Sequence, residues 1–154
     1  MGSVMIVALL LIAQGHFAFP VIQQPVGDPW HVSQHVNEIT QFSKATNVTL
    51  LAHNYLAGEN FSKLDIGDRL FLVREDSLVG YSVYAIDYYE TINPTLFRNL
   101  ETNEVISARS IIQRYYHDTD LTLQTCISRM GNDQWGLMFV VGRKMALKSH
   151  PLPK

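Results

Sequence analysis

Short segments rich in β-branched and aromatic residues alternate along the chain with turn-forming residues, a pattern typical of proteins built mostly from β-strands. We predict strands at residues 17–24, 47–54, 69–74, 79–89, 121–126 and 135–143. Residues 75–78, between the third and fourth of these, are typical of a hairpin loop. The pattern predicts an all-β barrel or sandwich to which one or two helices are added.

One α-helix is predicted at residues 107–117, because Ser107 can cap its first turn and one face is apolar. The apolar positions on that face are Ile111, Ile112, Tyr115 and Tyr116. A shorter helical turn is predicted near residues 57–64.

The uncharged run at residues 4–13 has three interpretations. It is too short for a membrane-spanning helix, which needs about 18–20 apolar residues. Its length fits the hydrophobic region of a secretory signal peptide, although no basic residue precedes it. The alternatives are a buried first strand or the remnant of a longer anchor. We therefore divide the chain into residues 1–16, with these interpretations open, one β domain at 17–145, and a tail at 146–154.

Composition and charge restrict the class of protein. With 154 residues, 47% hydrophobic and 17% charged, the chain has enough apolar sequence for one folded core and too much for disorder. The net charge of −2 offers no basic surface for nucleic acid. The single cysteine excludes an internal disulfide and a cysteine-rich metal site. Signatures of nucleotide binding and zinc proteolysis are missing, so we expect no metal, and a monomer is the default expectation.

Two residues at predicted strand ends are candidates for chemistry. Cys126 ends the strand predicted at 121–126 and precedes a polar loop predicted at 127–133, where solvent can reach a thiol. His53 ends another apolar run. A thiol beside an imidazole is suited to nucleophilic catalysis. Taken singly, however, a lone cysteine is more often a small buried apolar residue, and a strand-end histidine is more often structural.

Read together, the segments around these two residues resemble the sortase family. The resemblance is carried by LAHNYLAG at 51–58, by Phe61, Leu64 and Gly67-Asp68, and by TLQTC at 122–126. The segment at 131–141, with Gly131-Asn132, Trp135-Gly136 and Phe139-Val140-Val141, resembles the strand that follows the family's cysteine. Segments 19–25 and 40–42 look like sortase-like domains of environmental bacteria. The resemblance covers residues 17–142.

The resemblance implies a closed β-barrel of about eight strands with one or two short helices. It also implies a cysteine transpeptidase that cleaves the Thr–Gly bond of an LPxTG-like sorting signal through a thioester. An amine, from a cell-wall precursor or a pilin lysine, or else water, then resolves the thioester. By this resemblance Cys126 is the nucleophile, His53 is the acid that protonates the leaving amine, and Thr125 lines the substrate site. No cofactor is expected, and the place of action is extracellular or at the cell surface, with possible membrane anchoring.

One departure from the family puts activity in doubt. The family has an arginine on the strand after the cysteine, where this chain has Leu137. Arg143 is about 20 Å further along that strand, and Arg129 lies in the predicted loop. Loss of such an oxyanion donor costs about 10²–10³ in rate. Three hypotheses therefore stay open: an active transpeptidase or endopeptidase, an impaired sortase fold that binds peptides, and a β-barrel interaction module in which His53 and Cys126 are structural.

Overall fold

The computed structural model describes residues 5–13 and 17–146. In order, these residues form β1 (Ile6–Ile12), β2 (Phe17–Gln23), β3 (Ile39–Gln41), β4 (Val48–Leu51), the 3₁₀-helix η1 (Ala57–Lys63), β5 (Arg69–Val73), β6 (Leu78–Asn93), β7 (Leu96–Asn99), β8 (Val105–Ser107), α1 (Ala108–Tyr116), β9 (Leu121–Arg129) and β10 (Asn132–Lys144).

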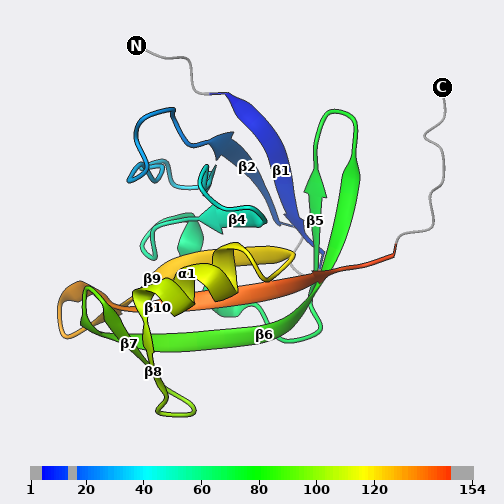
Figure 1. The fold of residues 1–154 in the computed structure, drawn as a ribbon. Helices are drawn as coiled ribbons and strands as arrows, with labels where there is room; N and C mark the ends of the chain where they lie inside the picture. The colour runs from blue at the N-terminus through cyan, green and yellow to red at the C-terminus, as the bar shows by residue number, and fades with distance from the viewer. Residues whose placement is uncertain (1–4, 14–16, 147–154) are drawn as a thin grey trace.

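Eight of these strands close into a barrel, which confirms the predicted all-β barrel of about eight strands. The order around it is β10-β9-β4-β3-β2-β1-β5-β6, and β6 pairs with β10 to close it. Two of the pairs, β2–β3 and β4–β9, are parallel and the other pairs are antiparallel. The hairpin β7–β8 continues the sheet beyond β6, outside the barrel (Figure 1).

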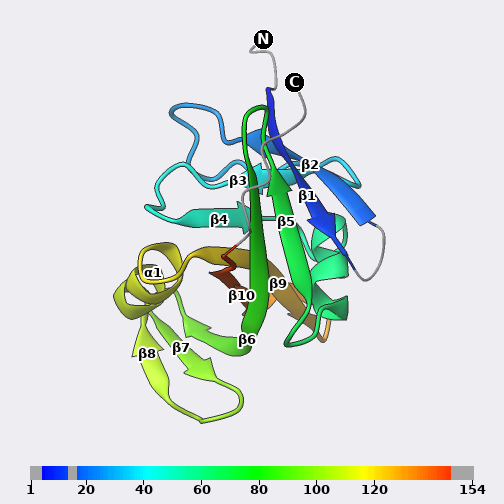
Figure 2. The same cartoon turned by 90° about the vertical axis from the view of Figure 1, so that its right-hand side faces the viewer.

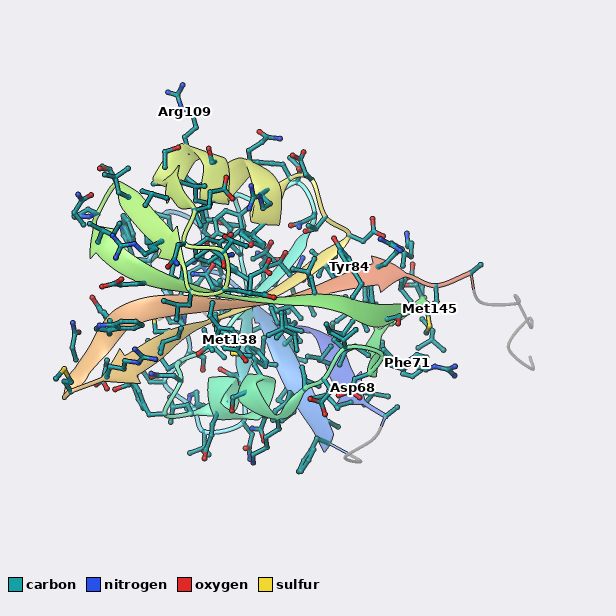
Figure 3. All side chains as sticks on the ribbon, turned by 90° about the horizontal axis from the view of Figure 1, so that it is seen from below. Asp68, Phe71, Tyr84, Arg109, Met138 and Met145 are labelled. Atoms are coloured by element: carbon teal, nitrogen blue, oxygen red, sulfur yellow. The ribbon has the colours of Figure 1, made fainter. Side chains whose placement is uncertain are left out.

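Apolar side chains on alternate strand positions fill the barrel, as the period of a half-buried strand requires. In β1 the inward residues are Ala8, Leu10 and Ile12, and in β9 they begin with Leu121 and Leu123. Two helices cover opposite sides of the layer that β6, β9 and β10 form: α1 lies on one side and η1 on the other (Figures 2 and 3).

A second core cluster lies outside the barrel, under α1. The Ser107 hydroxyl accepts a hydrogen bond from the Ser110 N–H at 3.1 Å, which confirms the predicted cap. The Tyr115 ring stacks on Phe139 with centroids 3.9 Å apart. The predicted apolar face is only partly right, because Ile112 is 46% exposed.

The connection between β2 and β3 is fixed by a buried amide. Gln24 is 1% exposed, and its Nε2 donates to the carbonyls of Pro29 and His31, each at 3.0 Å. Its Oε1 accepts from the Ser43 N–H at 3.2 Å and the Ser43 hydroxyl at 2.9 Å. A buried amide that is satisfied on both ends holds this connection, which contains no strand or helix of its own, against the barrel.

Two sequence predictions are resolved or corrected by the structure. Residues 6–12 form strand β1, paired with β2 on one side and β5 on the other, so within the described residues the first apolar run is a strand. Residues 1–4, 14–16 and the tail at 147–154 lie outside the described residues. No helix in the described ranges has the length and hydrophobicity that a membrane crossing requires.

The loop predicted at 127–133 is wrong. Strand β9 runs on to Arg129, and β10 already begins at Asn132. The chain reverses through Met130 and Gly131, whose φ angles are 51° and 76°. A two-residue hairpin turn whose twist matches that of its strands requires positive φ at both central residues, and Met130 and Gly131 meet this requirement. Two residues therefore connect the strands where we expected a loop of seven.

Candidate active site

Cys126 lies within β9 rather than at a strand end, which corrects our prediction. Its neighbours on alternate positions define two faces: Leu121 and Leu123 face the barrel core, whereas Gln124 faces α1 and accepts a hydrogen bond from the Tyr116 hydroxyl. Side chains two apart share a face, so Cys126 is on the same outer face as Gln124. The thiol is free and only partly buried.

The pairing of β4 with β9 brings the segment that carries His53 close to the part of β9 that carries Cys126. The two strands are parallel, with Leu51 opposite Gln124, and the Ala52 N–H donates to the Gln124 carbonyl at 3.2 Å. Strand β4 ends at Leu51, and His53 follows it by two residues, as Cys126 follows Gln124 on β9. No hydrogen bond joins the side chains of His53 and Cys126 among the described residues.

His53 is held by two residues that sequence analysis did not select. Its ring stacks on Tyr55, with centroids 5.1 Å apart and 19° between the planes. The Gln34 Nε2 lies 3.1 Å from the His53 Nε2, and the Tyr55 hydroxyl donates to the Gln34 Oε1 at 3.3 Å. Tyr55 follows His53 by only two residues, so the sequence could have suggested it as a neighbour of the ring. Gln34 lies in the β2–β3 connection, where no sequence motif or periodicity marks it.

The electrostatic surroundings keep the Cys126 thiol protonated. Burial raises the pKa of Cys126, and the carboxylate of Asp133 on β10 raises it further. Asp133 is itself held by a hydrogen bond from the Ser128 hydroxyl at 3.0 Å. Nearby, burial raises the pKa of Tyr116 to about 12, so this phenol stays neutral at physiological pH. A thiol in these surroundings needs a base to become a nucleophile.

Replacing Asp133 with asparagine should therefore make Cys126 more reactive. Removal of the negative charge lowers the pKa of the thiol, so a larger fraction is thiolate at pH 7. We expect about a twofold to fivefold faster reaction with iodoacetamide, and a pH–rate curve that moves to lower pH. Asp76→Asn, in the β5–β6 hairpin loop, is the matched control. Equal rates in the two variants would contradict the assignment.

Thr125 points away from Cys126, toward η1. It is 4% exposed, and its hydroxyl has no hydrogen-bond partner among the described residues. Together with Gly58 it lines a cavity of about 240 Å³ between η1 and β9, to which Cys126 also contributes. Figure 3 shows Met138, another lining residue, on the same side of the sheet as η1.

On the opposite side, an apolar groove of about 420 Å³ runs between α1 and the β2–β3 connection. Among the residues that line it are Trp30, Leu51, Tyr116, Gln124 and Leu137. Gln124 and Leu137 are neighbours of Cys126, on β9 and β10. An apolar groove that ends next to a thiol is suited to an extended peptide with apolar side chains.

No model of a known protein family matches the sequence, and no curated protein matches it. Solved structures do match. Sortase A from Corynebacterium diphtheriae superposes with a TM-score of 0.64 at 13% identity, over 99% of this chain and 65% of that one. Sortase C1 from Streptococcus suis gives 0.60 at 17% identity, over 93% and 74%. Sortase C1 from Streptococcus agalactiae gives 0.58 at 18% identity, over 92% and 68%. The chain has the sortase fold.

In this sortase fold, the residue directly across from Cys126 on β10 is Leu137. Arg129 and Arg143, the two arginines that sequence analysis considered as replacements, both stack on aromatic rings. Arg129 stacks on the Trp135 ring, with its guanidinium carbon 4.3 Å from the centroid. Arg143 stacks on Tyr84 at 4.6 Å, at a part of β10 beyond its pairing with β9. The side chain opposite the thiol is therefore apolar.

The described part of this sortase fold contains no group of three or more His, Cys, Asp or Glu side chains placed to hold a metal ion.

Proposed function

We propose that this protein is a sortase-like cysteine transpeptidase or endopeptidase that cleaves an LPxTG-like sorting signal through a thioester on Cys126. The observation that supports it most is the parallel β4–β9 pairing, because His53 follows Leu51 by two residues and Cys126 follows its partner Gln124 by two residues. An apolar groove lined by Leu51, Gln124 and Leu137 lies on the same side of β9 and β10. The sortase fold adds support from the architecture.

In this proposal His53 takes the proton of the Cys126 thiol, and the sulfur attacks the carbonyl carbon of the threonine in the sorting signal. The carbon–nitrogen bond then breaks, and the His53 imidazolium gives its proton to the leaving amine. In the second half the attacking amine or water loses a proton to His53. The carbon–sulfur bond breaks, and Cys126 recovers its proton. The partners are a sorting-signal peptide and an amine acceptor, met by a monomer at the cell surface or outside the cell.

A second candidate function is peptide binding without cleavage, and Leu137 is the observation that favours it. An apolar residue opposite the nucleophile offers no hydrogen bond to the oxyanion that develops in the tetrahedral intermediate. The apolar groove would still accept a peptide. In this case the fold keeps its recognition surface while its chemistry is slow or lost.

The experiment is incubation with a mixed library of LPxTG-like peptides, followed by intact-mass detection of a thioester. We expect an adduct on Cys126 that is missing in Cys126→Ala and strongly reduced in His53→Ala. Peptide binding without an adduct, with a thiol that still reacts with iodoacetamide, would support the binding module. A thiol that does not react with iodoacetamide would leave His53 and Cys126 with a structural role only.

A further inference from the structure

The cavity between η1 and β9 lies where one neighbouring strand of β9 ends. Strand β4 pairs with β9 only as far as Gln124, so beyond this residue β9 has a strand partner on the β10 side alone. Four successive residues of β9, at 125–128, line the cavity of about 240 Å³. Successive side chains of a strand point to opposite faces of the sheet. Their joint contribution therefore places the cavity along the open edge of β9, where it reaches both Thr125 and Cys126.

The Thr125 hydroxyl indicates that the molecule bound in this cavity is polar. It is the one buried side-chain oxygen or nitrogen that has no hydrogen-bond partner within the described ranges. Buried hydroxyl groups in folded proteins are almost always hydrogen-bonded. Because no described residue supplies the partner, we infer that a molecule in the cavity supplies it. The volume is several times the roughly 30 Å³ of one water molecule, so the cavity has room for a larger ligand.

The charge of the lining indicates the class of ligand. Glu59, in the first turn of η1, is the only Asp, Glu, Lys or Arg among the described residues that line this cavity. In the apolar groove on the other side of the sheet, the corresponding residue is the cation Lys44. A primary ammonium group is positively charged and has three hydrogen-bond donors and no acceptor. A carboxylate together with a hydroxyl that accepts a hydrogen bond suits this group.

We propose that this cavity binds the acceptor amine, a primary alkylamine such as a lysine side chain, with Glu59 and Thr125 as its binding residues. The role as acceptor rests on the proposed function, in which the sorting peptide occupies the apolar groove. The bound ammonium first gives one proton to solvent. The neutral nitrogen then attacks the thioester carbonyl carbon and loses a second proton to His53, the carbon–sulfur bond breaks, and His53 passes that proton to the sulfur of Cys126.

The first test measures binding without any reaction. Nα-acetyl-lysine methylamide is titrated into the full chain, and the backbone amide signals are followed by NMR. We expect shifts confined to residues 57–63 and 125–128, and none from the norleucine analogue, which lacks the amine. Glu59→Gln should weaken binding about twofold to fivefold, and Thr125→Val, which keeps the shape of the side chain, about fivefold. Glu75→Gln, in the β5–β6 hairpin loop, is the matched control and should change nothing.

The second test measures products and separates this proposal from the function on which it rests. With a cleavable peptide and the lysine probe, Glu59→Gln should lower the ratio of amide to acid product about twofold to fivefold. This ratio compares two fates of one thioester, so it does not depend on how fast the thioester forms.

Three outcomes would overturn the proposal. They are equal shifts from the lysine and norleucine probes, equal affinities in Glu59→Gln and Glu75→Gln, and a thioester that gives only acid at every amine concentration. The last of these would leave the endopeptidase function standing. Binding of the lysine probe that weakens in Glu59→Gln, in a protein that forms no thioester, would support the amine site and count against the proposed function alone.

Discussion

Replacing Leu137 with arginine should raise the rate of thioester formation on Cys126 by about 10²–10³, the gain associated with one oxyanion donor. Leu137 is the cross-strand partner of Cys126, so its side chain leaves the sheet on the same face as the thiol. A guanidinium there has five N–H donors within reach of the oxygen that becomes negative when the sulfur attacks.

The gain must be separated from two side effects of the substitution. Leu137 packs against the cluster under α1, so its loss should lower the free energy of unfolding by about 1–2 kcal/mol. Leu137→Ala removes the same packing without adding a charge or a hydrogen-bond donor. The new cation also favours the thiolate, and the iodoacetamide rate measures that part directly. An arginine variant that acylates no faster than the alanine variant would show that the oxyanion is supported elsewhere or that the site does not acylate.

The second large effect is expected at Gly58. A Cβ at this position would lie 2.3 Å from the Thr125 hydroxyl oxygen, 2.7 Å from the His53 carbonyl oxygen and 2.8 Å from the Ala52 carbonyl oxygen. Two of these atoms belong to the backbone and cannot rotate away. Gly58→Ala should therefore lower the free energy of unfolding by about 3 kcal/mol and the Tm by about 6–12 °C.

Two comparisons assign this loss to crowding at the site. Gly27→Ala has no atom within 4 Å of its new Cβ and a φ of 83°, so it should cost only about 1 kcal/mol through backbone strain. Adding Thr125→Ala to Gly58→Ala should restore part of the stability and not all, because the two carbonyls remain. If Gly58→Ala melts at the same temperature as Gly27→Ala, the close packing of η1 on β9 is not as described.

Sequence analysis located the strands whose alternation is strong and missed those that are short. Strand β5 buries alternate apolar residues and was predicted to within one residue, whereas β9 begins where it was predicted but runs on to Arg129. Strands β3, β7 and β8 have three or four residues, too few to show a period. The run at residues 4–13 could not be assigned because a short apolar segment fits several structures, and only its pairing with two neighbours makes it a strand.

For the candidate site, the sequence provided the residue types and the structure provided their arrangement. Cys126 and His53 were selected from their motifs, yet the reason given for Cys126, a loop after a strand end, is wrong because Met130 and Gly131 form a tight turn. Gln34 and Asp133 were not selected, because each acts on a residue distant in sequence or across a strand pair. Hydrogen bonds and charge interactions between distant segments produce no periodic pattern in the sequence from which they could be predicted.

The parallel pairing of β4 with β9 has a consequence for the order of events during synthesis. Strand β9 and its partner β10 come near the end of the described chain, and they join a strand that was made much earlier. Strand pairs between segments that are far apart in sequence form slowly, because the entropy of closing a long loop is lost before the stabilising contacts form. When His53 leaves the ribosome during synthesis, Cys126 has therefore not yet been made. The His53–Cys126 pair can therefore form only after most of the described chain has been synthesised.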